Sequence, residues 1–215
     1  MKLFFRLAAF PLLLLLAGCS EEPKTAAKKE PEKPPAPVGG RFALYQTYHM
    51  ARGWSADQTY PMARGWSADI QPVKLVSIHL PEVKYEAGKA AAWQVTWISP
   101  SRNTTRNYTY SVVESAGNLH KGVFQGNEER GIRAGSSTFL LAALKTETDE
   151  VYATALKKSA EYVKKNPDKP VSFLLEMNKK FPNLSWRVIW GDSVGTSNYS
   201  IFVDATTGLY LETTR

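Results

Sequence analysis

Two stretches of the chain show the same two patterns in the same order. Each has an apolar stripe at helical spacing, followed by a run of short strand-like segments. In the second stretch the stripe runs between residues 151 and 163, which predicts an amphipathic helix. Thr146 with Asp149 three residues later resembles a capping box that starts this helix, and Asn166-Pro167 ends it. The strands that follow are predicted at residues 171–177, 185–190, 199–204 and 209–213.

The first stretch has the same order of elements. Its helix is predicted within residues 42–66, and its strands at residues 73–80, 91–98, 107–114 and 119–124. The alternation of side chains along a strand puts Trp93, Val95 and Trp97 on one face. Links between consecutive strands are short in both stretches, and short links imply antiparallel pairing.

Matching residues in the two stretches indicate an internal repeat. Trp93-Gln-Val-Thr-Trp97 corresponds to Trp186-Arg-Val-Ile-Trp190, and Asn107-Tyr108-Thr109 corresponds to Asn198-Tyr199-Ser200. We therefore predict an α+β fold of two similar halves, residues 41–135 and 136–215, each a helix packed on a four-stranded antiparallel sheet. The paired tryptophans are expected to be core residues beneath the helices, because each aromatic side chain buries about 150–250 Å².

The end of the chain resembles a known family. Phe202-Val-Asp-Ala-Thr-Thr-Gly208 resembles the closing hairpin of PepSY-type domains, where a strand runs into a Val-Asp-Ala-x-Thr-Gly turn and out into a last strand. The resemblance covers residues 146–213, and it reaches residues 42–124 only through the internal repeat. It implies a PepSY-like or cystatin-like fold in an exported, non-enzymatic protein that binds or restrains other envelope proteins, peptidases among them.

The N-terminus has the layout of a secretory signal. Lys2 and Arg6 precede an apolar run that is too short for a transmembrane helix. Leu16-Ala-Gly-Cys19 resembles the lipobox of bacterial lipoproteins, which implies removal of residues 1–18 and acylation of Cys19. Cys19 is the only cysteine of the chain. An ordinary signal peptide would leave this lone thiol unexplained in an exported protein, so we predict lipidation at Cys19, with membrane lipid as a partner.

A linker follows the lipidated cysteine. Residues 20–40 hold five Pro, four Lys, four Glu and no aromatic residue, a composition that cannot bury enough apolar surface to fold. We therefore assign residues 19–40 to the lipidated cysteine and a disordered tether. Ser20, in place of Asp, favours the outer membrane by the sorting rules of Gram-negative lipoproteins, with the folded part facing the periplasm.

A younger repeat lies at the first predicted helix. Residues 46–57 recur as residues 58–69, with His49 replaced by Pro61 as the one difference. Two copies are too few for a solenoid, and Pro61 would break a helix interior. We interpret the repeat as a slippage duplication in which one copy packs and the other is an extension. A functional pair of Arg-Gly-Trp loops is the alternative.

The composition and the spacing of residues give few indications of a catalytic, metal-binding or nucleic-acid-binding site. From Arg41 onward the chain holds 21 basic and 16 acidic residues, without the aromatic-interleaved basic run that would suggest nucleic acid. His49, His79 and His120 have no metal-ligand spacing. Asp204 is expected to accept backbone N–H bonds in its turn rather than act in catalysis. We predict no enzymatic activity and no cofactor, metal or nucleic-acid partner.

Three functions remain open at this point. The leading one is an envelope module that binds or regulates a protein or peptide through a sheet face or edge. The second is a structural envelope component with no dedicated ligand. The third is a small-ligand carrier or a hydrolase, which would need a pocket with convergent polar groups, for instance with His79 or His120 beside a carboxylate.

Overall fold

The computed structural model describes residues 34–52, 65–117 and 119–215, and the unit Pro34–Arg215 is compact. The predicted signal peptide, Cys19 and most of the linker lie outside the described residues. The elements are α1 (Gly40–Arg52), β1 (Gln71–Ile78), β2 (Ala92–Ser99), β3 (Thr104–Ser111), β4 (Gly122–Arg130), the 3₁₀ helix η1 (Leu141–Ala143), α2 (Thr148–Lys165), β5 (Val171–Met177), β6 (Leu184–Trp190), β7 (Ser200–Asp204) and β8 (Tyr210–Thr214).

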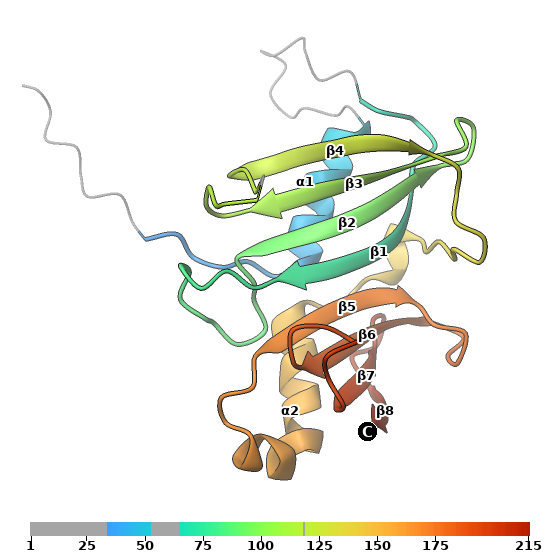
Figure 1. The fold of residues 1–215 in the computed structure, drawn as a ribbon. Helices are drawn as coiled ribbons and strands as arrows, with labels where there is room; N and C mark the ends of the chain where they lie inside the picture. Colours follow the sequence, from blue (N-terminus) through green and yellow to red (C-terminus); the bar gives the residue numbers. More distant parts are fainter. Residues whose placement is uncertain (1–33, 53–64, 118) are drawn as a thin grey trace, which may run out of the picture. The chain divides into compact units, whose positions relative to one another are not determined.

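All eight described strands belong to one antiparallel sheet, in the order β4-β3-β2-β1-β5-β6-β7-β8 (Figure 1). The predicted fold class, with a separate four-stranded sheet in each half, is wrong. The protein is dominated by a single continuous sheet, because β1 pairs with β5. Leu75 lies opposite Leu175 in this pairing, with Lys74 opposite Glu176 beside it.

The pairing of β1 with β5 has a simple physical cause. Each strand would otherwise be the edge of a four-stranded sheet and would expose unpaired backbone N–H and C=O groups. In β5, Val-Ser-Phe-Leu-Leu-Glu-Met, one face is apolar and the other is mixed, with Ser172, Leu174 and Glu176. This alternation predicts a strand, but nothing in the sequence identifies a partner about a hundred residues earlier.

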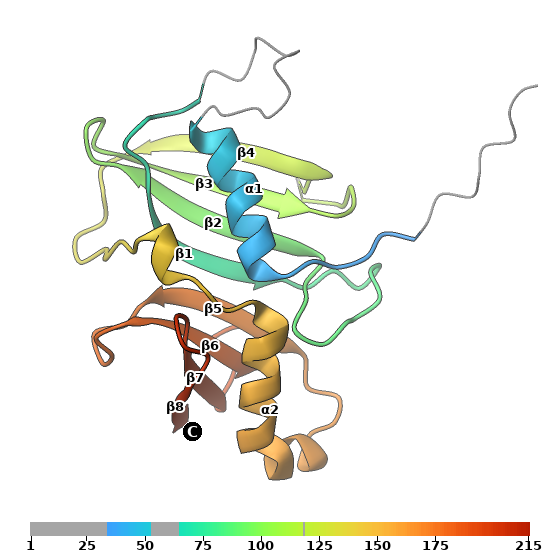
Figure 2. The ribbon, with the colours of Figure 1, turned by 180° about the vertical axis from the view of Figure 1, so that it is seen from behind.

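Both helices lie on the same face of the sheet (Figure 2). α1 contacts β1, β2, β3 and β4, and α2 contacts β6 and β7. The prediction that the repeated tryptophans form the core is confirmed, because Trp93, Trp97, Trp186 and Trp190 are all fully buried. The rings of Trp93 and Trp186 meet edge to face at 6.3 Å between centroids. Neither described helix lies over the opposite face of the sheet.

The start of α2 differs from the predicted capping box. Glu147 is the N-cap, and its carboxylate accepts the N–H of Thr148 at 2.9 Å. The same carboxylate accepts the backbone N–H groups of Arg41 and Phe42 in the first turn of α1. Thr146 instead donates its hydroxyl to the carbonyl of Ala205. One acidic side chain thus serves two helix N-termini, where negative charge is favourable.

The described fold takes residues from both copies of the duplication. The first copy supplies residues 46–52 at the end of α1, and the second supplies residues 65–69. Trp66 is buried, and its backbone N–H donates to the carbonyl of Ala51 at 2.7 Å. Joined end to end, these two segments have the sequence of one complete repeat unit, Gln-Thr-Tyr-His-Met-Ala-Arg-Gly-Trp-Ser-Ala-Asp. The remaining residues of the duplication, 53–64, lie outside the described residues.

Candidate functional site

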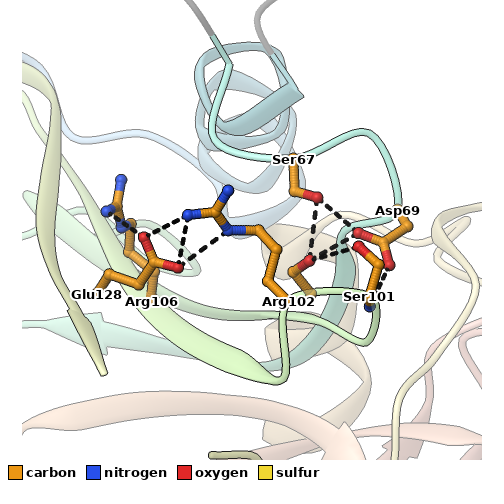
Figure 3. Close-up of polar contacts among 7 residues, drawn as sticks. Ser67, Asp69, Ser101, Arg102, Arg106 and Glu128 are labelled. Carbon is orange, nitrogen blue, oxygen red and sulfur yellow. Dashed lines mark hydrogen bonds and ion pairs between the residues drawn. The ribbon is translucent and has the colours of Figure 1, made fainter. Parts of the chain in front are cut away.

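Asp69 is the centre of a polar cluster near the end of β2 (Figure 3). Its carboxylate accepts the hydroxyls of Ser67 and Ser99 at 2.6 and 2.7 Å, and the backbone N–H of Ser101 at 2.7 Å. These donors, Ser67 first, hold the pKa of Asp69 well below its usual range. The carboxylate is already engaged from three sides, so the cluster fastens residues 65–69 to the sheet.

Glu128 forms a second cluster in the same view (Figure 3). Arg102 donates to both of its carboxylate oxygens, at 3.0 and 3.1 Å, and Arg106 adds a third bond at 3.1 Å. The Arg102 guanidinium is the main reason that the pKa of Glu128 is lowered to about 2. Arg106 also lies over the Trp66 ring, 5.3 Å from its centroid. This network ties β3 to β4 and to Trp66, which is a structural role.

The turn aspartate behaves as the sequence predicts. Asp204 accepts the backbone N–H groups of Thr206 and Thr207, each at 2.8 Å, and the Asn183 side-chain amide at 3.0 Å. Burial acts to raise the pKa of Asp204, but the bonds from Asn183, Thr207 and Thr206 together outweigh burial and lower it. Asp204 therefore organises the hairpin between β7 and β8.

The three histidines are not brought together. His49 lies on α1 and His79 borders a small hollow of about 20 Å³. The Nδ1 atom of His120 lies 2.6 Å from Glu114, and both side chains are largely exposed. A histidine–carboxylate pair is thus present, but it is a surface pair. Among the described residues there is also no group of three His, Cys, Asp or Glu side chains placed to hold a metal ion.

A groove of about 600 Å³ lies on the face of the sheet opposite the two described helices, at the end where β2 and β4 terminate. We call it the strap groove. Its wall is the strap, residues 131–139, which runs past the ends of β3, β2 and β1 (Figure 1). The strap is fastened at both ends. Gly131 accepts the Thr105 hydroxyl and donates its N–H to Asn103, and the N–H of Phe139 donates to Pro72 on β1.

The floor of the strap groove is a polar row that crosses four neighbouring strands. Asn107 on β3 lies opposite Thr96 on β2, Thr96 lies opposite Lys74 on β1, and Lys74 lies opposite Glu176 on β5. Thr96 donates its hydroxyl to the Asn107 side-chain oxygen at 2.7 Å, so the Asn107 amide N–H groups stay available as donors. Ile98, buried against the strap, adds an apolar contact surface.

The charged side chains of the strap groove differ from those in Figure 3. Lys74 and Glu176 on the floor, and Glu129 and Arg133 at the rim, form no hydrogen bond or ion pair through their side chains with described residues. Asp69 and Glu128, by contrast, have their carboxylates fully engaged. The strap groove therefore combines a preformed shape with charged side chains that form no ion pair among the described residues.

Glu176 is the most unusual of these groups, because it is half-buried. Burial raises the pKa of Glu176, and the nearby charges of Lys74 and Arg187 oppose that shift without cancelling it. Arg187 does not reach Glu176, since it donates to Ser200 and lies over the Phe202 ring. The floor of the groove therefore holds a carboxyl group whose charged form the nearby cations stabilise only in part.

A second hollow, of about 550 Å³, lies along α2. Lys157, Lys158 and Lys165 border it, and Tyr162 stacks on Tyr199 with 3.8 Å between ring centroids. Lys165 lies in the last turn of α2, where the helix dipole favours a basic residue. Lys158 lies over the Tyr210 ring, 5.1 Å from its centroid.

Sequence reasoning named Cys19 as its one site residue, and Cys19 lies outside the described residues. It missed the strap groove. The outward positions of β1, β2 and β3 were visible in the alternation, but the strap has no periodic pattern and Glu176 reaches the floor only through the pairing of β1 with β5. Among the described residues, no helix has the length and apolar character needed to cross a membrane.

Comparison with protein-family models, with curated proteins and with solved structures finds no match for this chain. The resemblance of residues 146–213 to PepSY-type domains stays a prediction from the sequence. The function has to be argued from the geometry of the strap groove and from the sequence of the N-terminus.

Proposed function

We propose that this protein is a lipid-anchored, non-catalytic module of the bacterial envelope that binds a segment of another envelope protein in the strap groove. The observation that carries the proposal is a preformed groove whose charged side chains form no hydrogen bond or ion pair within the described residues. The anchor rests on the lipobox at Cys19 and on the linker that follows it, which favour attachment to the outer membrane with the module facing the periplasm.

The shape of the strap groove favours a polypeptide over a compact small molecule. The polar row runs across the strands, from β3 to β5, and the strap borders the groove. A polypeptide bound along this row would contact side chains of the groove at several points, as in other modes of peptide recognition. A purely structural component would not need such a set of available groups.

Site-specific photo-crosslinking tests this proposal in membranes of the bacterium that produces the protein. A photoreactive residue replaces Thr96 on the groove floor, and the matched control replaces Thr109, which is on the same face but does not line the groove. We expect a discrete crosslinked adduct with a second protein from position 96 and none from position 109. No adduct from position 96, or the same adduct from both positions, would contradict the proposal.

A further inference from the structure

The C-terminal half of α2 presents a cluster of positive charge away from the sheet (Figure 2). Lys157, Lys158, Lys164 and Lys165 are all exposed, and Glu161 is the one acidic residue between them in the sequence. We call these four lysines the basic face. Granting the lipid anchor of the proposed function, we infer that the basic face docks on anionic phospholipid headgroups of the membrane that holds the anchor.

The position of the basic face follows from the packing of α2. Ala155 is fully buried against the sheet. At about 100° per residue, Lys157 and Lys164 lie on the side of the helix opposite Ala155, turned away from the sheet. Lys158 and Lys165 lie on the neighbouring flank, where they border the hollow along α2. The four lysines thus share one sector of the helix about 120° wide, which a flat surface can contact at once.

The ammonium groups of the basic face are available to a partner. None of them forms an ion pair with described residues, and neither does Glu161, although it lies three or four positions from each lysine. The contact of Lys158 with the Tyr210 ring leaves its charge in place. The helix dipole favours Lys164 and Lys165 in the last turn. It does not account for Lys157 and Lys158, about two turns earlier.

Charge complementarity favours an anionic surface as the occupant. Residues 157–169 hold five lysines and two acidic residues, an excess of three, whereas residues 41–215 as a whole have an excess of five basic residues. More than half of the net charge of the folded part therefore lies in this short stretch. Lysines are flexible point charges, and clusters of them on an amphipathic helix are typical of contacts with anionic lipids.

The border of the basic face has the side chains that suit a membrane interface. Tyr162 stacks on Tyr199 beside the lysines, and tyrosine combines an apolar ring with a polar end that favours the headgroup level. Leu209, next in the chain to Tyr210, is 66% exposed. An exposed apolar side chain beside lysines adds buried area when a helix lies on a bilayer.

The tether is long enough for this contact. The backbone N–H of Gly40 donates to the Thr148 hydroxyl at 3.0 Å, so the linker joins the fold at the N-terminus of α2. The 18 residues of α2 extend about 27 Å from there, whereas the chain from Cys19 to Gly40 can span up to about 70 Å. Because the anchor keeps the fold close to the lipid, a weak attraction for each lysine is enough.

Lysine reactivity of the acylated full chain on vesicles tests the inference. The chain is transferred to vesicles of phosphatidylcholine alone or of equal parts phosphatidylcholine and phosphatidylglycerol. At about 50 mM salt, acetylation of Lys157 and Lys165 should be at least about threefold slower on the anionic vesicles, and about 0.5 M salt should remove the difference. Lys121, exposed just before β4, should react equally on both. Equal rates for Lys157 and Lys165 on the two vesicles, or the same slowing of Lys121, overturn the inference.

Two double variants locate the effect on α2. Lys158→Glu with Lys164→Glu reverses half of the basic face, so Lys157 and Lys165 should react equally on the two vesicles. Lys84→Glu with Lys121→Glu makes the same change of charge at exposed positions outside α2 and should keep the slowing of Lys157 and Lys165. If both double variants lose it equally, the attraction is a property of the net charge and the assigned surface is wrong.

The outcomes separate this inference from the proposed function. A chain that stays on both kinds of vesicle while Lys157 and Lys165 react equally refutes the docking of α2 alone, because the anchor and the strap groove do not depend on it. A chain with no affinity for either vesicle refutes the anchor and the inference together. Slowing by purified peptidoglycan but not by anionic vesicles would assign the basic face to an anionic glycan and overturn docking on lipid.

Discussion

Deleting residues 53–64 should leave the free energy of unfolding within about 1 kcal/mol of the wild-type value, whereas deleting residues 46–57 should lower it by about 3 kcal/mol or more. Each deletion leaves one copy of the repeat. The two products differ at a single residue, because the first keeps His49 and the second has Pro61 in its place. Each product therefore serves as the other's control.

The first deletion joins two segments that already form one structure. Trp66 would follow Ala51 by three residues, and its N–H already donates to the Ala51 carbonyl at 2.7 Å. A bond between residues three apart is common where a helix ends. The second deletion places proline in the last turn of Gly40–Arg52, where it removes the N–H at position 49 and collides with the carbonyl four residues earlier.

Equilibrium denaturation in urea, followed by tryptophan fluorescence, measures both deletion products. A loss of more than about 2 kcal/mol on deletion of residues 53–64 would show that these residues stabilise the fold, against the interpretation of the repeat as a slippage duplication. Equal stability of the two products would show that position 49 does not need a helical N–H, which would contradict the described end of α1.

Gly88→Ala should lower the free energy of unfolding by about 3 kcal/mol or more. Gly88 has a φ of +76°, a conformation that L side chains rarely adopt. An added Cβ would also lie 2.3 Å from the Cα of Asp149, in the first turn of α2. Because that contact is with backbone, it cannot be relieved by rotating a side chain.

Gly117→Ala is the matched control for this substitution. Its φ of +81° is nearly the same, but apart from its chain neighbours no atom of the described residues lies within 4 Å of the added Cβ, so only the conformational cost of about 1–2 kcal/mol applies. Thermal and urea denaturation of both variants give the comparison. Similar losses for Gly88→Ala and Gly117→Ala would mean that residue 88 does not pack against the start of α2.

The elements of the second half could be predicted closely because the information is local. The segment predicted at residues 171–177 matches β5, Val171–Met177, and the core tryptophans followed from alternation within β2 and β6. β4 was predicted too short, at residues 119–124 instead of Gly122–Arg130. It is an edge strand whose end reads Gln-Gly-Asn-Glu-Glu-Arg, so no apolar face marks it.

What could not be predicted depends on contacts between residues far apart in the sequence. The pairing of β1 with β5 turns two expected sheets into one. Glu147, which caps α2, also binds the N-terminus of α1 more than a hundred residues away. The strap groove needs both the single sheet and the strap, because Lys74 and Glu176 become neighbours only through β1 and β5. Local patterns contain none of these partners.

Reactivity of lysine amines in the wild-type chain tests the central claim most directly. The acetylation rate of Lys74, on the groove floor, is compared by mass spectrometry between envelope membranes and the purified full chain, with Lys121, just before β4 and outside the groove, as the internal reference. If a partner segment occupies the strap groove, Lys74 should react at least about fivefold more slowly in membranes, while Lys121 keeps its rate. The same rate for Lys74 in both samples would contradict occupation of the groove.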